Sequence, residues 1–564
     1  MSTLYGSDAM GGVINIITRK VGKQWNGTVS GDYTVQEESS FGDVKGAKFY
    51  LSGPLASEVL GLALRGSTLR RDAADIKYEN QNGVVTERMG ANPVESTVHN
   101  LGARLAFTPN RYHEFMLDAD ATRQTYDNAA GQLGTLGVQG GYGPKQKYNR
   151  DQYTASYRAR LPFGTWDNSY MVNRTETIGR TIPPGTPGAL AGSARTLEVE
   201  SKVFDTKLLL PWGSHLTTIG GQYWDAEMVD GVAPQTFAFT QKALFLEDEW
   251  RFHERVALTI GARYDDHSIF GGQTSPRGYL VWTATPRWTF KGGVSKGYKT
   301  PRVEQLAPGI NGFGGQGTIP LVGSPGLKPE TSITTELGAH FDNGAGWTAN
   351  ASLFNNEFRD KITSGTGLLN CDYRLAPNRP GCVSFGPWPN VDAFGQSTNV
   401  DEAVTRGLEL ATRFPLAAGW AASANYTYTD SEQKSGPNEG KPLSDTPEHA
   451  VNARLTWDIS PQSNAWLRAE YRSERYRDPG SSAATHAARD TLGDYKGYTM
   501  LHLGASYRFT PAVTLNAALY NLLNKDFIDY RPYRASATAA PTYTSVYVNN
   551  ADGRRLWLSL NVDF

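Results

Sequence analysis

The chain has 564 residues, of which 39% are hydrophobic and 20% charged, and its formal net charge is −1. No apolar run approaches the roughly eighteen residues that a membrane-spanning helix needs, which excludes helical membrane proteins. The near-neutral charge provides no global basic field for nucleic acid, so a charged ligand has to be bound locally. Sixty glycines, 28 tyrosines, 22 phenylalanines and 13 tryptophans instead favour strands, tight turns and aromatic belts.

The amino end shows no secretory signal peptide, since Met1 is followed by Ser-Thr-Leu-Tyr-Gly rather than by a basic and then an apolar stretch. We therefore expect the natural start to lie upstream. The first strand is expected near residues 25–35.

Alternating apolar and polar residues recur along most of the chain, as strands with two different faces require. Residues 451–459 place Val451, Leu455 and Trp457 on one face and Arg454 on the other. Many of these segments are about ten residues long and end in an aromatic residue, which is typical of tilted membrane strands. The same pattern occurs at residues 258–264 and 501–509.

Short turns and long polar segments also alternate along the chain. The short turns are expected near Pro54, Pro109, Phe163, Trp212, His253, Pro286, Gly344, Pro415, Pro461 and Pro511. The long segments span residues 127–143, 181–195, 306–326, 365–399, 430–445 and 477–494. The spacing predicts an all-β fold, a transmembrane antiparallel β-barrel of about 22 strands with short periplasmic turns and long extracellular loops.

The two cysteines, Cys371 and Cys382, lie in a segment rich in Pro, Gly and Asn. This placement favours one small disulfide-closed loop in an oxidising compartment, with two free thiols as the alternative.

Residues 4–20, LYGSDAMGGVINIITRK, resemble the last piece of the plug domain of TonB-dependent receptors. The other matching strings resemble the catecholate siderophore branch of that family most. They begin at Gly261 (GARYDDHSIFGGQTSPRGYLV), Lys291 (KGGVSKGYKTPRVEQLAP), Val322 (VGSPGLKPETSITTELG), Gly440 (GKPLSDTPEH), Tyr520 (YNLLNKDF) and Asp552 (DGRRLWLSLNVDF). The resemblance implies a residual plug end at residues 1–20, followed by the barrel at residues 21–564.

This resemblance implies a receptor in the outer membrane of a Gram-negative bacterium that takes up a ferric siderophore. Iron would be carried as the chelate, without a resident cofactor or metal. TonB would be a partner only where the plug and its TonB-contacting segment are present. The alternative is a plug-less passive pore or a non-functional truncated receptor. A haem receptor is less favoured because residues 297–330 contain no histidine.

Other expected partners are outer-membrane lipid and the barrel assembly machinery, with a colicin or a phage as opportunistic ligands. We expect a monomer. No nucleophile, base and orienting group form a recognisable set, so the sequence indicates a transporter rather than an enzyme.

A ferric tris-catecholate is a large anion with aromatic faces, so its site needs Arg or Lys for charge and aromatic rings for stacking. Two segments, both interpreted as loops, offer these residue types, and solvated loops with scattered charge are the alternative. The first segment holds Tyr142, Lys145, Lys147 and Tyr148, and the second holds Arg174, Arg180 and Arg195. The resemblance also implies ligand-contacting arginines in a loop at the second position.

Three other groups of residues are given ordinary structural interpretations. Tyr298, Lys299 and Arg302 are interpreted as strand-end anchors. Asp265, Asp266 and His267 are interpreted as residues at a strand end, because the sequence offers no second cluster at metal-ligand spacing. Residues 131–143 lack the strand, helix and Gly-Lys-Ser/Thr context of a phosphate-binding loop and are interpreted as an ordinary loop.

The chain ends in an alternating strand that resembles the signal read by the outer-membrane assembly machinery. We expect it to pair with the first strand, and its terminal phenylalanine to direct insertion. Its residues on one face are Leu556, Leu558, Leu560, Val562 and Phe564.

Overall fold

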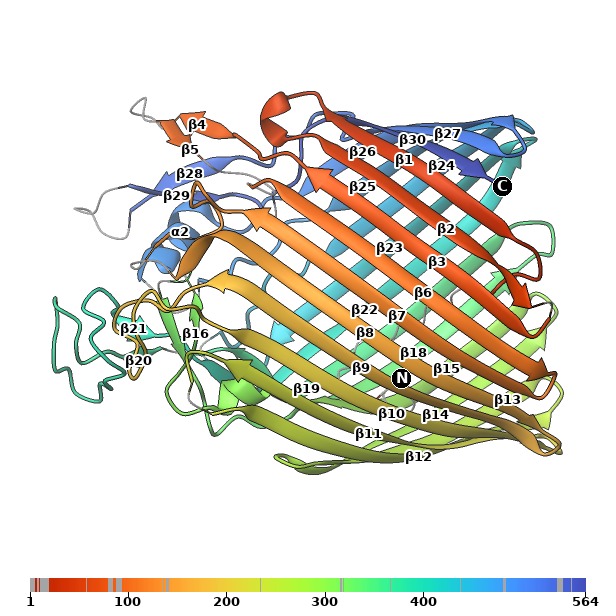
Figure 1. Ribbon diagram of the computed structural model, residues 1–564, viewed down its shortest axis with the longest axis horizontal. Coiled ribbons are helices and arrows are strands. Elements are labelled where there is room, and N and C mark those ends of the chain that lie inside the picture. The colour runs from red at the N-terminus through yellow and green to blue at the C-terminus, as the bar shows by residue number, and fades with distance from the viewer. Residues whose placement is uncertain are drawn as a thin grey trace.

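A computed structural model describes residues 6–7, 10, 20–56, 58–79, 85–87, 94–134, 136–137, 141–233, 235–314, 317, 319–365, 367–436, 438–479, 483–534, 541–548 and 550–564. Within them, 22 strands form one antiparallel sheet that closes on itself (Figure 1). The first strand, β1 (Asn26–Gln36), pairs with β2 (Val44–Ala56) on one side and with the last strand, β30 (Arg555–Asp563), on the other. The predicted barrel is therefore confirmed.

The remaining barrel strands follow one another in chain order, each paired with the next. They are β3 (Leu60–Arg71), β6 (Ser96–Asn110), β7 (His113–Asp127), β8 (Tyr142–Leu161), β9 (Gly164–Arg180), β10 (Leu197–Trp212), β11 (His215–Asp230), β12 (Phe237–His253), β13 (Val256–His267), β14 (Gly271–Thr285), β15 (Trp288–Lys299), β18 (Glu330–Asp342), β19 (Thr348–Ser364), β22 (Ser397–Ala417), β23 (Trp420–Gln433), β24 (His449–Ser460), β25 (Ser463–Arg472), β26 (Tyr498–Thr510) and β27 (Val513–Tyr520).

The two ends of the barrel differ in the length of their connections, as the sequence predicts. All ten expected short turns lie at one end, and the long connections lie at the other (Figure 1). No helix in the described ranges is long and apolar enough to cross a membrane. The long connections carry β4 (Lys77–Glu79), β5 (Val85–Glu87), β16 (Ile310–Gly314), β17 (Ile319–Val322), β20 (Leu368–Leu369), β21 (Ala393–Phe394), β28 (Tyr530–Tyr533), β29 (Thr542–Ser545), the helix α2 (Ala483–Leu492) and the 3-10 helices η1 (Ser39–Phe41) and η2 (Val303–Leu306).

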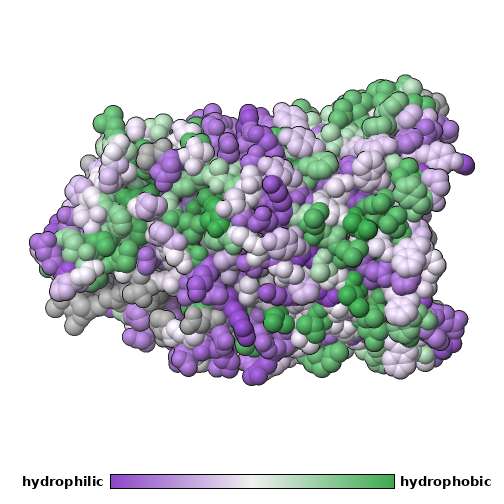
Figure 2. Space-filling model, turned by 90° about the horizontal axis from the view of Figure 1, so that it is seen from below, coloured by the Kyte–Doolittle hydropathy of each residue, from purple (hydrophilic) through white to green (hydrophobic). Residues whose placement is uncertain are grey.

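The closing strand β30 shows how alternation separates the two faces of the wall. Leu558 and Leu560 are exposed on the outer surface, whereas Ser559 between them is only 3% exposed. Beyond the strand, Phe564 continues the ladder, because its backbone exchanges hydrogen bonds of 2.7 and 2.9 Å with Gly27 near the start of β1. Hydrophobic side chains gather on the outer wall toward the short-turn end (Figure 2). This surface suits contact with lipid.

Aromatic side chains gather beside the short turns and stack across neighbouring strands. The Trp212 and His215 rings lie 4.1 Å apart, and the Trp420 and Trp457 rings 4.9 Å apart. An amphipathic ring is well suited to the boundary between lipid and water, so this belt marks one membrane interface.

The inner wall carries paired charges, and one of these pairs is fully covered. Arg263 and Asp265 on β13 form an ion pair of 2.9 Å with side chains 1% and 0% exposed. Gly6 lies beside this pair, since a Cβ on Gly6 would be 3.0 Å from the Arg263 guanidinium. Most of the expected plug segment, residues 1–20, is outside the described residues, so that domain boundary stays a prediction.

Candidate functional site

A cavity of about 830 Å³ opens inside the barrel at its loop end, against strands β9 to β13 and the β15–β18 loop. Its wall follows the register of the sheet, because Thr177, Leu197 and Asp230 are neighbours across β9, β10 and β11 and all line it. The alternate residues Ile178 and Val229 are exposed on the outer surface. The cavity therefore lies on the luminal face, where long loops can admit a ligand from outside the cell.

Arg180 reaches this cavity because of an irregularity at the end of β9. The register between β8 and β9 shifts between the pairs Lys147 with Ile178 and Tyr142 with Arg180. Gly179 permits the shift, since its φ is +95° and a Cβ there would overlap the Lys145 carbonyl. Strict alternation would have placed Arg180 outside.

The Arg180 guanidinium retains capacity to bind an anion. It lies 5.7 Å from the Tyr142 ring centroid, which brings two of the predicted residues together. Its Nε is buried, and no atom of the described residues accepts a hydrogen bond from it. Because Arg180 lines the cavity, its cationic side chain can meet an anionic ligand there.

Arg195 lines the same cavity, but its charge is already paired. Its guanidinium donates two hydrogen bonds, of 2.7 and 2.5 Å, to the Asp230 carboxylate, and both side chains are buried. It also lies 5.3 Å from the Phe313 ring centroid. The Arg195 backbone N–H donates to the Arg180 carbonyl at 3.0 Å, which closes the base of the β9–β10 loop. Arg195 thus holds this loop and one aromatic wall in place.

Two further cations, interpreted from the sequence as anchors, also line the cavity. Lys299 at the end of β15 is exposed, and Arg302 forms an ion pair of 3.2 Å with Glu304. Tyr298 does act as an anchor, because it is 1% exposed and its hydroxyl accepts a hydrogen bond of 3.1 Å from Gln241. The direction of Lys299 and Arg302 depends on how the loop leaves the strand, which the sequence does not reveal.

Part of the cavity lining, on β11 to β13, is aromatic, and sequence reasoning missed it. The Trp224 and Phe239 rings meet edge to face at 5.0 Å, and the Phe239 and His267 rings stack at 4.7 Å. All three line the cavity. Trp224 and Phe239 both occupy inward-facing positions of the paired strands β11 and β12. Knowledge of the β11–β12 register would have identified them.

The other predicted binding residues are not gathered at this site. The segment 142–148 is the first part of β8 rather than a loop, so its residues alternate in direction. Tyr148 faces inward, and its ring centroid lies 5.6 Å from that of Tyr126. Lys145 and Lys147 are exposed on the outer face of the strand, as is Tyr153.

Arg174 likewise lies within β9 rather than in a loop, and its side chain is 64% exposed on the outer face. Its Nε donates a hydrogen bond of 3.0 Å to Glu200 on β10. This surface pair is separate from the cavity.

A metal site is not formed by Asp265, Asp266 and His267. Asp265 pairs with Arg263 inside the barrel, whereas the backbone alternation directs Asp266 outward. No group of three or more His, Cys, Asp or Glu side chains suited to a metal occurs among the described residues. Cys371 and Cys382 form a disulfide, with their Cα atoms 5.1 Å apart.

The chain is similar to known proteins in sequence and in fold. Residues 58–522 match the family model described as TonB dependent receptor-like, beta-barrel. The iron-regulated outer membrane virulence protein of Vibrio cholerae serotype O1 (El Tor Inaba N16961) is 32% identical over all of this chain and 78% of its own length. The ferric enterobactin receptor of Pseudomonas aeruginosa PAO1 is 28% identical over 99% of this chain and 79% of its own.

The fold has close counterparts among solved structures. A crystal structure of a variant of the Pseudomonas aeruginosa ferric enterobactin receptor in complex with enterobactin matches with a TM-score of 0.77. The match covers 100% of this chain and 84% of the other, at 22% sequence identity. At that identity, the likeness concerns the fold.

Proposed function

The chain belongs to the TonB-dependent receptor family, and we propose that it is an outer-membrane receptor that takes up a ferric siderophore, with a catecholate as the chelating group. Its barrel lies in the outer membrane of a Gram-negative bacterium. The names of two relatives, an iron-regulated outer membrane protein and a ferric enterobactin receptor, support this proposal. It is a transporter rather than an enzyme.

The observation that carries the proposal is the composition of the cavity at the loop end. Arg180 at the end of β9 and Lys299 at the end of β15 provide cationic groups, and Trp224 and Phe239 on the strands between them provide aromatic faces. A ferric tris-catecholate is both anionic and aromatic, so one ligand can contact both kinds of group through ionic and cation-π or stacking interactions. The protein would contact the organic shell, and the iron would stay within its chelate.

The barrel presents other surfaces on which further partners are proposed. The outer wall contacts lipid, and β30 together with the following Phe564 is the segment read by the assembly machinery. Coupling to TonB is proposed for the form of the protein that carries the plug and its TonB-contacting segment. The extracellular loops are the place where a colicin or a phage would attach. We propose that the barrel functions as a monomer.

The proposed ligand class can be tested by titrating the purified barrel with two ferric chelates while tryptophan fluorescence is recorded. One chelate is a ferric tris-catecholate, and the other is a neutral ferric trihydroxamate of similar size. We expect saturable quenching by the catecholate and at least about tenfold weaker binding of the neutral chelate, since the latter loses the charge contacts. Equal affinities, or no binding of the catecholate, would overturn the assignment.

A further inference from the structure

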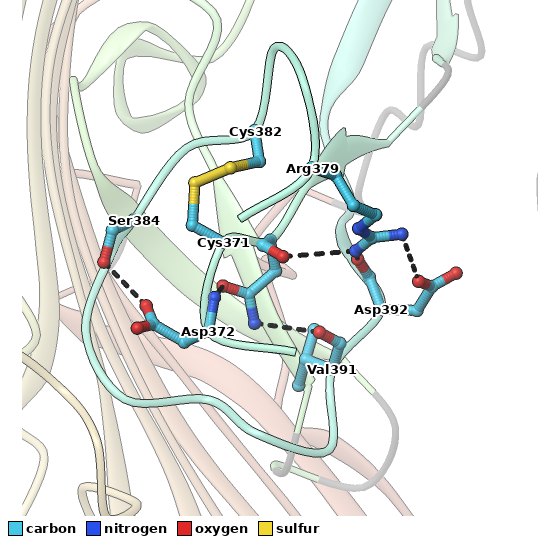
Figure 3. Close-up of a disulfide and its surroundings, with 8 residues drawn as sticks. Cys371, Asp372, Arg379, Cys382, Ser384, Val391 and Asp392 are labelled. Carbon is cyan, nitrogen blue, oxygen red and sulfur yellow. Dashed lines mark hydrogen bonds and ion pairs between the residues drawn. A yellow bond between two sulfur atoms is a disulfide. The ribbon is translucent and has the colours of Figure 1, made fainter. Parts of the chain in front are cut away.

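The loop between β19 and β22 is closed internally by the Cys371–Cys382 disulfide. None of its described residues lines the cavity. Beside the disulfide, the Val383 N–H donates a hydrogen bond of 2.8 Å to the Leu369 carbonyl, which joins the segment after Cys382 to the segment before Cys371. Two side-chain contacts, Ser384 with Asp372 at 2.7 Å and Arg379 with Asp392 at 2.7 Å, reinforce the loop (Figure 3). The loop is therefore cross-linked within itself.

Asn370, beside Cys371, transmits this rigidity to Trp388. Its side chain is 0% exposed, and its amide donates to the carbonyls of Trp388 at 2.7 Å and Val391 at 2.8 Å. The Trp388 ring is buried, with its centroid 6.0 Å from that of Phe313, which lines the cavity. The disulfide is thus linked to a cavity wall through two side chains.

The contact between Trp388 and Phe313 belongs to a small apolar core that the β15–β18 loop and the disulfide loop share. Ile310 and Val322 of the β15–β18 loop are buried together with Trp388 and Phe394 of the disulfide loop. The Val322 N–H also donates to the Gly395 carbonyl at 2.9 Å. The β16–β17 hairpin, which carries Phe313, therefore depends on the disulfide loop for half of its core.

The disulfide loop also lies against the β9–β10 loop, which connects Arg180 to Arg195. A Cβ on Gly386 would be 2.2 Å from the Gly185 carbonyl oxygen, and a Cβ on Gly185 would be 2.8 Å from the Pro387 carbonyl oxygen. Both glycines have positive φ, +101° and +91°. The two backbones approach so closely that only glycine fits at either position.

We propose that the disulfide-closed loop is a positioning element that sets the geometry of the binding cavity without touching the ligand. It holds Phe313 through Trp388, and it holds the loop between Arg180 and Arg195 through the two glycines. The ligand part of this inference rests on the proposed function, whereas the mechanical part does not. Opening the disulfide should loosen two loops that contain no cysteine.

The mechanical part is tested by amide hydrogen exchange on the folded, purified barrel. The forms compared are the oxidised protein, the reduced protein and the Cys371→Ser/Cys382→Ser variant, with heat modifiability on gels as the check that the barrel is closed. We expect faster exchange at residues 310–314, 319–322 and 183–195 when the bridge is open. Faster exchange confined to the disulfide loop itself would overturn the proposal.

Two variants separate positioning from general loop disorder. Gly386→Ala leaves the disulfide intact but pushes the β9–β10 loop away, so we expect faster exchange at residues 183–195 only. Leu375→Ala is the matched control, since Leu375 lies in the disulfide loop and is 76% exposed. It should leave exchange in both neighbouring loops unchanged, and a change there equal to that of the open form would contradict the proposal.

The effect on binding is tested by titration with a ferric tris-catecholate. Opening the bridge should weaken affinity about three- to tenfold, the equivalent of one aromatic contact. In a Phe313→Ala background, the same opening should have less effect, because the two changes act through one contact. Additive losses, or unchanged affinity on opening, would refute the positioning role. Absence of catecholate binding by the unaltered protein would refute the proposed function, and the exchange experiment would still decide the mechanical claim.

Discussion

Replacement of Arg180 by alanine isolates the contribution of one cation to ligand binding. Arg180 is half-buried, and no described residue accepts a hydrogen bond from its buried Nε. Arg195 cannot substitute for it, since the Asp230 carboxylate already accepts both of the hydrogen bonds described above. A hydrogen bond from a charged group contributes ~1.5–3 kcal/mol, and partial exposure favours the lower part of that range, so we expect about a 10- to 30-fold loss of affinity.

The assay is fluorescence titration of purified variants with a ferric tris-catecholate at constant ionic strength. Arg174→Ala is the matched control, because Arg174 lies on the same strand but pairs with Glu200 on the outer face. We expect the control to change affinity by less than about twofold. Equal losses in the two variants would mean that overall charge matters rather than the cavity, and unchanged affinity in Arg180→Ala would refute the assignment of Arg180.

Two predictions concern the barrel wall. Deleting Phe564 should lower the yield of heat-modifiable barrel in the outer membrane, since Phe564 joins the last strand to Gly27; normal yield would contradict this. Leu558→Arg should destabilise the folded barrel by ~2–4 kcal/mol, because Leu558 lies near the middle of β30 and a charge there would face lipid. Leu558→Ala is the control for lost apolar contact, and equal unfolding midpoints in urea would show that this face does not meet lipid.

The architecture of the wall could be predicted because its rule is local. Alternation in segments such as residues 451–459 specifies a face for every residue, and Pro or Gly marks the turn that follows. The closing strand, with Ser559 turned inward between Leu558 and Leu560, obeys the same rule. The strand count followed from the ten turns alone.

The candidate site was harder to predict, because it depends on where strands end and how loops pack. The sequence favours a loop for residues 142–148, yet the hydrogen-bonded ladder of β8 extends through them and turns Lys147 away from Tyr148. Arg180 faces the cavity only through the irregularity at Gly179. The position of Lys299 in the cavity and the contact between Trp388 and Phe313 depend on the paths of the loops. No local sequence pattern encodes those paths.

The most direct test of the proposed function is a crystal structure of the barrel with a bound ferric tris-catecholate, in which anomalous scattering locates the iron. We expect the iron peak inside the cavity, with the chelate in contact with Arg180, Lys299 and Phe239. An iron peak elsewhere on the barrel, or direct coordination of the iron by protein side chains, would contradict the account.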